Sequence, residues 1–318
     1  MANLAGTTET YNLIGLREDL TDMIYMISPT ETPFLSGIGR ASAKAITHEW
    51  QTDTLAAPAA NQQPEGDEYT TWTEVAATRR LKNTTQISTK RFLISGTAQV
   101  VSKAGRSDEI GYQLAKHSQE LKRDVEFNLT QNSVWTDGAA DGTARKSAGY
   151  ETWMLTNRDA IGAATVSTLG QPNESVTVTD GAQRALLESM LKNVLQQCYT
   201  SGGNPNLVMA GPRNKQNISA FSGNTTRFDR SEDMRLVTAI DVYVSDYGEV
   251  HVVPNRFQRE RSVLVVDMRY WAIGFLRPFK TFDLAKTSDG DKKVVLAEFT
   301  MEARNEASSG IIADLTTT

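Results

Sequence analysis

Residues 107–132 read SDEIGYQLAKHSQELKRDVEFNLTQN and carry the clearest helix pattern of the chain. Apolar residues recur there at spacings of three or four, the period of one helix face. Ser107 is the expected N-cap, with Asp108 and Glu109 in the first turn, where they suit the helix dipole. At 1.5 Å per residue the helix would span roughly 39 Å. The expected apolar stripe is Ile110, Leu114, His117, Leu121, Val125 and Leu129, and the expected polar face is Gln113, Lys116, Glu120, Lys122, Arg123 and Glu126. A stripe this long and narrow is typical of a helix that lies across a sheet.

The sequence before this helix reads as one long excursion over residues 45–95. Strand composition over 46–55 is followed by a small, polar tip over 56–67 that two prolines interrupt. Strand composition returns over 69–81 and 84–95. A two-stranded ribbon with so few large apolar residues is marginal in water. We therefore expect it to lie on another surface, such as a neighbouring subunit.

The N-terminal segment predicts a short arm. The apolar period over 13–27 indicates a helix, which Ser28-Pro29 would end. Residues 30–35 read as a stiff extended link. Residues 37–42, GIGRAS, resemble a dinucleotide-binding loop, but no strand precedes them and no helix follows, so a flexible joint is the better interpretation.

The sequence after the long helix predicts a compact α/β subdomain. Residues 137–171 read as a loop with short strands, in which Trp153 and Met154 are the bulky anchors. Asp180 is the expected cap of a second helix. The expected apolar face of this helix is formed by Leu187, Met190, Leu191, Val194, Leu195 and Cys198. Further patterns predict a strand at 207–210 and a helix at 213–221 with Pro212 at its start. They also predict a hairpin around 246–248, a core strand at 263–267, strands at 270–275 and 279–284, and an alternating strand at 294–304.

Composition excludes several classes of protein. The 318 residues carry Lys+Arg 33 against Asp+Glu 38, a net charge of −5, which argues against tight, sequence-independent nucleic-acid binding. One Cys cannot form an internal disulfide, and three scattered His do not form a zinc motif. No apolar run is long enough to cross a membrane, and the start of the sequence has no secretory pattern. Thr occurs 36 times, 17 of them before residue 98, which favours extended, half-exposed structure there.

No constellation of residues forms a recognisable catalytic motif. The sequence contains neither a P-loop nor a G-x-S-x-G elbow. Cys198 lies on an apolar helix face and His117 in the apolar stripe, so both are interpreted as packing residues. His48 and His251 lie on expected strands without a nearby acid and nucleophile. We expect no cofactor and no metal.

Charged and aromatic residues provide candidate contacts between subunits. Basic residues of the excursion are either solvated or bound to acidic patches of identical neighbours, for which Arg has the better geometry. The acidic cluster of Asp229, Glu232 and Asp233 is read as a solvated or inter-subunit segment rather than as paired catalytic acids. The candidate contacts are Trp50, Arg79, Arg80, Lys90, Arg91, Arg227, Arg230, Glu232 and Asp233.

The order of these segments, together with four stretches of sequence, resembles the Hong Kong 97 (HK97) fold of tailed-phage major capsid proteins. The resemblance is to the SU-ten-like branch and covers nearly the whole chain. The stretches are EDL at 18–20 with ISPTETPF at 27–34, HEWQTD at 48–53, NKQNISAF at 214–221, and 298–305 followed by GII at 310–312.

The resemblance implies an α+β fold with five parts and a structural function. The parts would be an N-terminal arm (1–39), an extended loop (40–95), a peripheral domain (96–180) with a spine helix at about 107–132, an axial domain (181–283) and return strands of the peripheral domain (284–318). Pentamers and hexamers of the chain would form an icosahedral head around double-stranded DNA, assembled in the host cytoplasm without contact to a membrane. The ribbon begins so early that a separate scaffolding protein is expected; a portal protein and a decoration protein are further expected partners. An encapsulin-like compartment shell and a cytosolic hydrolase built on the 229–233 carboxylates remain the alternatives.

Overall fold

The computed structural model of the chain describes residues 28–317, except for 67, 69–71, 73, 76, 104, 106–107, 140–141, 162–177 and 222–240. The expected helix at 13–27 and the charged segment at 227–235 therefore lie outside the described residues. Within the described part, the chain forms a four-stranded sheet, a six-stranded sheet and a two-stranded ribbon.

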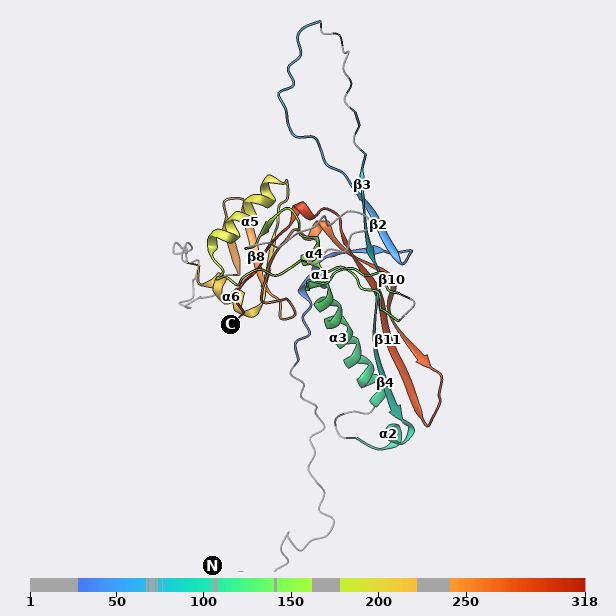
Figure 1. Cartoon of the computed structure of the whole chain (residues 1–318). Helices are drawn as coiled ribbons and strands as arrows, with labels where there is room; N and C mark the ends of the chain where they lie inside the picture. The colour runs from blue at the N-terminus through green and yellow to red at the C-terminus, as the bar shows by residue number, and fades with distance from the viewer. Residues whose placement is uncertain are drawn as a thin grey trace, which may run out of the picture.

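The four-stranded sheet and the long helix α3 form the lower lobe in Figure 1. The strands, in spatial order, are β1 (Gly39–Ser42), β10 (Trp271–Leu284), β11 (Gly290–Ala303) and β4 (Gln86–Ser95). Helix α3 (Glu109–Thr130) packs on β4 and β11, as its narrow stripe predicts, and the short α2 (Gly96–Val100) follows β4. Strand β10 pairs with β11 from Trp271–Ala303 to Leu284–Lys292, so residues 271–284 belong to this sheet.

Two details of α3 correct the sequence interpretation. The N-cap is Asp108 rather than Ser107, since the Asp108 carboxylate accepts hydrogen bonds from the backbone N–H groups of Ile110 and Gly111. The stripe is confirmed at Leu121, Val125 and Leu129, which are buried. Glu126, expected on the polar face, is also fully buried.

The six-stranded sheet with α5 and α6 forms the second lobe. Its strands, in spatial order, are β5 (Arg158–Asp159), β12 (Gly310–Ile312), β9 (Val263–Val266), β6 (Leu207–Ala210), β8 (Gly248–Pro254) and β7 (Val242–Ser245). Its helices are α5 (Glu188–Thr200) and α6 (Pro212–Ser219). The predicted hairpin, the core strand and the Pro212 start of α6 are confirmed.

Asp180 does not cap α5, because the helix begins only at Glu188. The preceding chain is held by Arg184, which forms a β-bridge with Leu315. Leu187, expected on the apolar face, is 54% exposed, whereas Leu191, Val194, Leu195 and Cys198 are buried as predicted.

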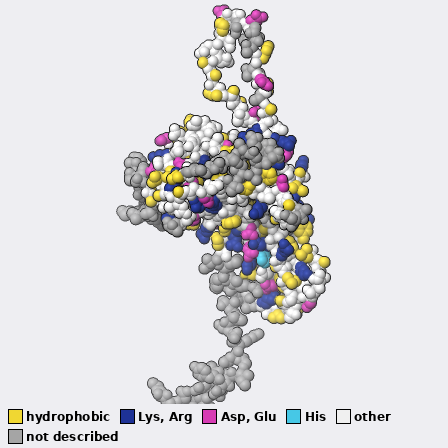
Figure 2. Space-filling model, viewed as in Figure 1, with side chains coloured by type: hydrophobic (Ala, Val, Ile, Leu, Met, Phe, Trp, Pro, Cys, Tyr) yellow, Lys and Arg dark blue, Asp and Glu magenta, His cyan; other side chains and the backbone are white. Residues whose placement is uncertain are grey.

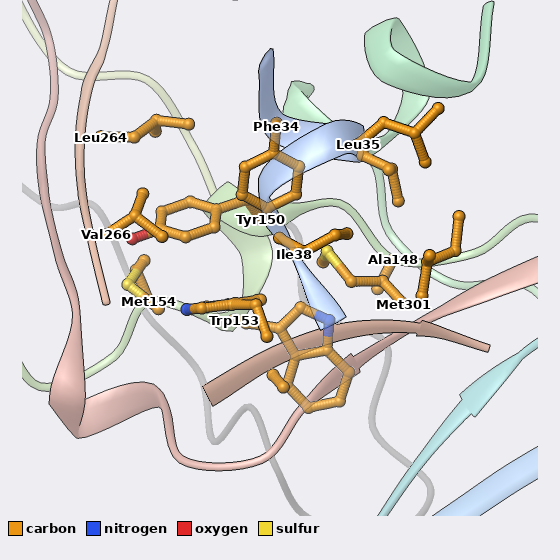
Figure 3. Packing of buried hydrophobic residues seen from close by; sticks show 14 of the residues in the cluster. Phe34, Leu35, Ile38, Ala148, Tyr150, Trp153, Met154, Leu264, Val266 and Met301 are labelled. Carbon is orange, nitrogen blue, oxygen red and sulfur yellow. The ribbon is translucent and has the colours of Figure 1, made fainter. Parts of the chain in front are cut away.

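The core between the lobes contains the start of the described chain (Figure 3). Residues 33–37 form the short helix α1 (Pro33–Gly37) instead of an extended link, with Pro33 in the first turn, where its missing N–H costs nothing. Phe34 is fully buried, 5.8 Å from the Tyr150 ring and 6.4 Å from the Trp271 ring between ring centres. Tyr150 and Trp153 belong to α4 (Tyr150–Trp153), a helix the sequence pattern does not reveal.

The GIGRAS stretch is not a free joint. Residues 39–42 form β1, which pairs with β10 in parallel register from Gly39–Ala272 to Ser42–Phe275. The backbone hydrogen bonds of this pairing fix the chain where flexibility was expected.

The ribbon is shorter than the sequence suggests. Strands β2 (Thr47–Thr52) and β3 (Arg79–Thr84) pair from Thr47–Thr84 to Thr52–Arg79. The expected strand at 84–95 is instead β4, which pairs with β11 over its whole length and so belongs to the body. The loop between β2 and β3 extends away from both lobes (Figure 1).

Candidate inter-subunit surfaces

The root of the ribbon is fixed to its own subunit. The Trp50 indole N–H donates to the carbonyl of Ala303 at 2.8 Å, and its ring lies 5.5 Å from that of Trp153. His48 Nε2 lies 3.3 Å from the Glu302 carboxylate. The hydrogen bond from His48 and the nearby Arg304 hold the pKa of Glu302 below its ordinary value. Trp50, a candidate contact with a neighbour, is therefore an internal anchor of the ribbon.

A second anchor lies on β3. Asn83 is fully buried, and its amide donates to the carbonyl of Met301 at 2.7 Å and to the hydroxyl of Ser147. Thr84 donates to Asp137 at 2.9 Å. Both strands of the ribbon are thus bonded to the body, so the loop between them starts from a rigid base.

The described part of the loop leaves its apolar side chains exposed. Every described residue between 53 and 78 is exposed, including Leu55 at 99%, Trp72 at 85% and Val75 at 92%. Exposed apolar side chains on a projecting element are typical of a surface that binds a partner. Figure 2 shows magenta and yellow side chains on this loop but no dark blue ones.

The basic candidate residues fall into two places. Arg79 and Arg80 lie at the ribbon root, where Arg80 pairs with Glu49 at 3.3 Å. Lys90 and Arg91 lie on β4, where Lys90 binds Asp124 of α3 at 2.7 Å and Arg91 is exposed. Arg227, Arg230, Glu232 and Asp233 lie outside the described residues.

Glu126 anchors the N-terminal arm, a role that the helical period conceals. Its carboxylate accepts hydrogen bonds from the backbone N–H of Phe34 at 2.9 Å and of Leu35 at 2.7 Å. A third bond comes from the Asn255 amide at 2.7 Å. Burial raises the pKa of Glu126, and these three donors partly offset the rise. The carboxylate takes the place of an N-cap for α1, since the Thr32 side chain makes no cap bond.

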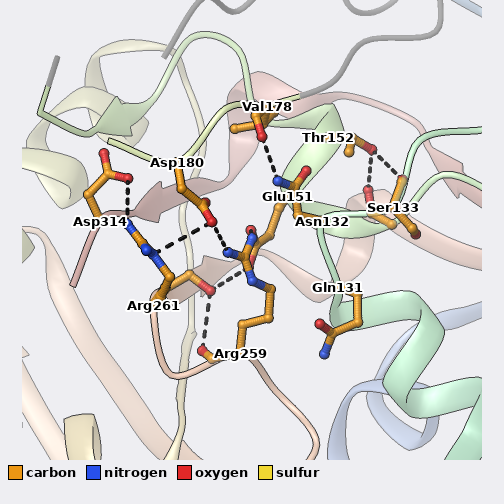
Figure 4. Close-up of polar contacts among 12 residues, drawn as sticks. Gln131, Asn132, Ser133, Glu151, Thr152, Val178, Asp180, Arg259, Arg261 and Asp314 are labelled. Atoms are coloured by element: carbon orange, nitrogen blue, oxygen red, sulfur yellow. Dashed lines mark hydrogen bonds and ion pairs between the residues drawn. The ribbon is translucent and has the colours of Figure 1, made fainter. Parts of the chain in front are cut away.

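A second network of buried and partly buried charges connects Glu151 of α4 with Arg259, Asp180 and the segment around Asp314 (Figure 4). The Arg259 guanidinium binds Glu151 and Asp180 at 2.6 Å each. Burial raises the pKa of Glu151, and Arg259 opposes this rise. The Asp314 carboxylate accepts from the backbone N–H of Gly181 at 2.6 Å. The carboxylates of Glu151, Asp180 and Asp314 are each bound by a guanidinium or a backbone N–H group. These contacts connect separate segments of the chain, so we interpret the network as stabilising the fold.

The residues considered for chemistry have packing roles. Cys198 is fully buried, and burial raises the pKa of its thiol to about 12. His117 bonds Glu120 at 2.8 Å and stacks on Phe92 at 5.1 Å between ring centres, as the packing interpretation predicts. Across the described ranges, no group of three His, Cys, Asp or Glu could hold a metal ion. The carboxylates at 229–233 lie outside the described residues.

The described helices were compared with the requirements of a membrane span. None of those described combines the length and the apolar character that a membrane span requires.

Comparisons with known proteins agree with the architecture. A family model described as SU10 major capsid protein matches residues 3–316. The major capsid protein of Escherichia phage Phieco32 is 24% identical over 336 residues, which cover 95% of each chain. A chain of the cyanophage A-1(L) capsid superimposes with a TM-score of 0.68 at 15% identity, covering 99% of this chain and 100% of that one. A chain from phage G major capsid and decoration proteins gives 0.52 at 10% identity, covering 99% and 100%. These likenesses show a mixed α/β, HK97-like capsid fold.

Proposed function

Because the chain belongs to the SU10 major capsid protein family, we propose that its pentamers and hexamers build an icosahedral head in which each projecting loop contacts a neighbouring subunit. The chain is a structural protein of the virion head, a major capsid protein and not an enzyme. The family match favours the phage head over the encapsulin-like compartment and the hydrolase.

The observation that carries the inter-subunit contact is the loop between β2 and β3. Its root is bonded to the body through Trp50 and Asn83, while Leu55, Trp72 and Val75 stay exposed. A closed shell made of one chain gives every such loop an identical neighbour to bind. Stability then depends partly on the assembled lattice and on subunit concentration.

We propose a division into parts that is based on the sheets. We assign residues 1–39 to the arm and 40–84 to the extended loop, which ends before β4. The peripheral domain then holds α3 with the four-stranded sheet, including β4 and β10, and the axial domain holds the six-stranded sheet with α5 and α6. This division modifies the one expected from the sequence at residues 95 and 283.

The proposed partners are further copies of the chain, a separate scaffolding protein, a portal protein and packaged double-stranded DNA. A decoration protein is also proposed, because the phage G structure contains decoration proteins beside its major capsid proteins. The net charge of −5 suits a container that encloses DNA without adhering to it. Assembly would take place in the host cytoplasm.

Deletion of residues 58–64 tests the proposed contact. These residues are exposed, so we expect a soluble subunit with unchanged thermal unfolding and impaired shells in electron micrographs. The matched control replaces the same seven positions with Gly and Ser and keeps the length of the loop. Comparison of the two variants separates the effect of loop length from the effect of the side chains. Normal, equally stable particles from the deletion variant would show that the loop is not an assembly contact.

A further inference from the structure

Strand β7 forms a free edge of the six-stranded sheet. It is the last strand in the spatial order, and among the strands that the structure describes it pairs only with β8. The backbone N–H of Val252 donates to the Asp241 carbonyl at 2.8 Å, so the antiparallel alternation places the hydrogen bonds to β8 at positions 241, 243 and 245. The N–H and C=O groups of Val242 and Val244 therefore point away from the sheet, where a further strand can bind them.

The side chains of this edge do not protect it from pairing. Edge strands usually carry Lys, Pro or a bulge, because unpaired edges attract other strands. Strand β7 reads VYVS, and its pairing with β8 is regular from Val242–His251 to Ser245–Gly248. Val242 is 41% exposed and Val244 66%. An edge of this composition is typical of a strand that pairs with a partner.

A groove of about 340 Å³ lies between this edge and helix α5. The helix lies on the side of the second lobe away from the four-stranded sheet (Figure 1). One wall comes from a flank of α5, at residues spaced by four, Glu188, Lys192 and Gln196. The other wall is the segment 243–247. A groove beside a free edge can accept an extended peptide, whose main chain binds the edge while its side chains enter the groove.

The side chains of β7 alternate between the groove and the opposite face of the sheet. Tyr243 points to α5, where its hydroxyl donates to Glu188 at 3.1 Å. Val242 and Val244 therefore point to the opposite face. Glu249 of β8 is aligned with Val244 and lies on that face as well. An incoming strand would meet apolar side chains there, with a carboxylate beside them.

The groove side offers aromatic rings and a carboxylate. Tyr247 stacks on Tyr199 with 4.8 Å between ring centres, and both rings are exposed. Asp246 is exposed, and it lines the groove together with Tyr247. A guanidinium can stack on an aromatic ring and bind a carboxylate at the same time. The groove therefore suits Arg side chains.

The charge around the groove is negative. The hairpin at residues 241–251 has no Lys or Arg and three carboxylates, Asp241, Asp246 and Glu249. Glu188 of α5 is the fourth carboxylate, and it binds Lys192 at 2.9 Å. Lys215 of α6 binds Asp241 at 3.2 Å. Four carboxylates against two lysines leave a local charge of −2.

We propose that this edge binds an extended basic segment of a partner protein. The segment adds antiparallel to β7, with Arg side chains in the groove and apolar side chains on Val242 and Val244, whose backbones offer up to four hydrogen bonds. Two copies of the edge would repel each other through their carboxylates, which favours a basic partner over self-pairing. The groove is complete within one subunit, so this binding goes beyond the proposed function and does not depend on it.

The test is a titration of the soluble full-length chain into a labelled probe peptide, Thr-Val-Arg-Val-Arg-Val-Thr with blocked ends, followed by fluorescence anisotropy. V244P removes an outward N–H group and keeps the bonds of β7 to β8, because Pro is tolerated on the open side of an edge strand. V244A keeps the backbone and is the matched control for the lost side chain. We expect V244P to weaken binding by at least about tenfold and V244A by about threefold or less.

Two altered probes test the same contact on the wild-type chain, whatever the stability of V244P. N-methylation of the probe's Val residues removes the N–H groups that would face β7 and should weaken binding by at least about tenfold. Replacement of both Arg by Glu should weaken it at least as much, because the groove is acidic.

Several results would overturn the proposal. Equal losses from V244P and V244A, or undiminished binding of the methylated probe, would show a side-chain contact without an added strand. Tight binding of the Glu probe, or no binding of the original probe, would contradict a site for basic strands. Self-association of the wild-type chain that V244P abolishes would assign the edge to a second copy instead. Shell formation is measured separately, so each of these results leaves the proposed function intact.

Discussion

Replacement of Glu126 by Ala should destabilise the subunit strongly, because three donors lose their acceptor at once. The backbone N–H groups of Phe34 and Leu35 and the amide of Asn255 all bind this carboxylate. A buried donor left without a partner costs about 1–3 kcal/mol. The variant no longer buries a charged carboxylate, and this gain offsets part of the cost of the three unpaired donors. We therefore expect a loss of about 3–5 kcal/mol in the free energy of unfolding.

The assay is urea unfolding at pH 7, followed by tryptophan fluorescence, because the nearby Trp271 is buried in the core. Asp124→Ala provides the control on the same helix, since the Asp124–Lys90 pair is partly exposed and worth about 1 kcal/mol or less. Limited proteolysis should cut the arm before residue 34 faster in Glu126→Ala than in the control. A loss below about 1 kcal/mol, equal to that of the control, would refute the anchoring role of Glu126.

Three further predictions concern the fixed points of the fold. Trp50→Phe keeps an aromatic ring beside Trp153 but removes the N–H donor to the Ala303 carbonyl, so thermal unfolding should show a loss of about 1–3 kcal/mol and proteolysis a looser ribbon root. Gly181→Ala would place a Cβ 2.1 Å from the carbonyl oxygen of Ile161, so we expect a loss of about 1–3 kcal/mol by urea unfolding; wild-type stability would contradict the close approach. Burial raises the pKa of Glu126 in the folded state, so the part of its stabilisation that is linked to protonation is fully present below the ordinary glutamate pKa of about 4.3 and is lost as pH rises through the raised value, while the three hydrogen bonds to its oxygens remain. The decline of unfolding free energy with pH across that window should therefore be smaller in E126Q, and an unchanged slope would argue that another group titrates there.

The sequence predicts those elements whose period matches one buried face. Leu121, Val125 and Leu129 mark α3 because only one stripe of that helix meets the sheet. Val263–Val266 is a short apolar run, and its burial on both faces as β9 follows the same reasoning. A local sequence pattern therefore predicts the packing of an element only where the element has a uniform environment along its length.

The missed features depend on contacts distant in sequence. Glu126 is polar in the helical period, yet it receives backbone donors from residues 34 and 35, which no local pattern signals. The strand at 86–95 has ribbon composition, but its partner β11 lies about two hundred residues later. Asp180 looks like a helix cap, although its carboxylate is bound by Arg259. Local propensity yields to such long-range pairing.

The candidate contact residues likewise combine features that the sequence shows with contacts that only the structure shows. The sequence names Lys90 and Arg91 together as candidate contacts, but it cannot tell that Lys90 binds Asp124 of α3 while Arg91 is exposed. Trp50 stands out as an aromatic residue on an exposed ribbon, and only the structure reveals the Ala303 carbonyl beneath it. Because side chains alternate between the two faces of a strand, one of two neighbouring basic residues forms an internal ion pair and the other is exposed.

Electron cryo-microscopy of the assembled particle tests the central claim most directly, namely that the loop at 53–78 is a contact between subunits. The account predicts an icosahedral shell in which density for each loop lies against a second copy, with Trp72 covered. A shell in which the loop extends freely into solvent, or folds back on its own subunit, would contradict it.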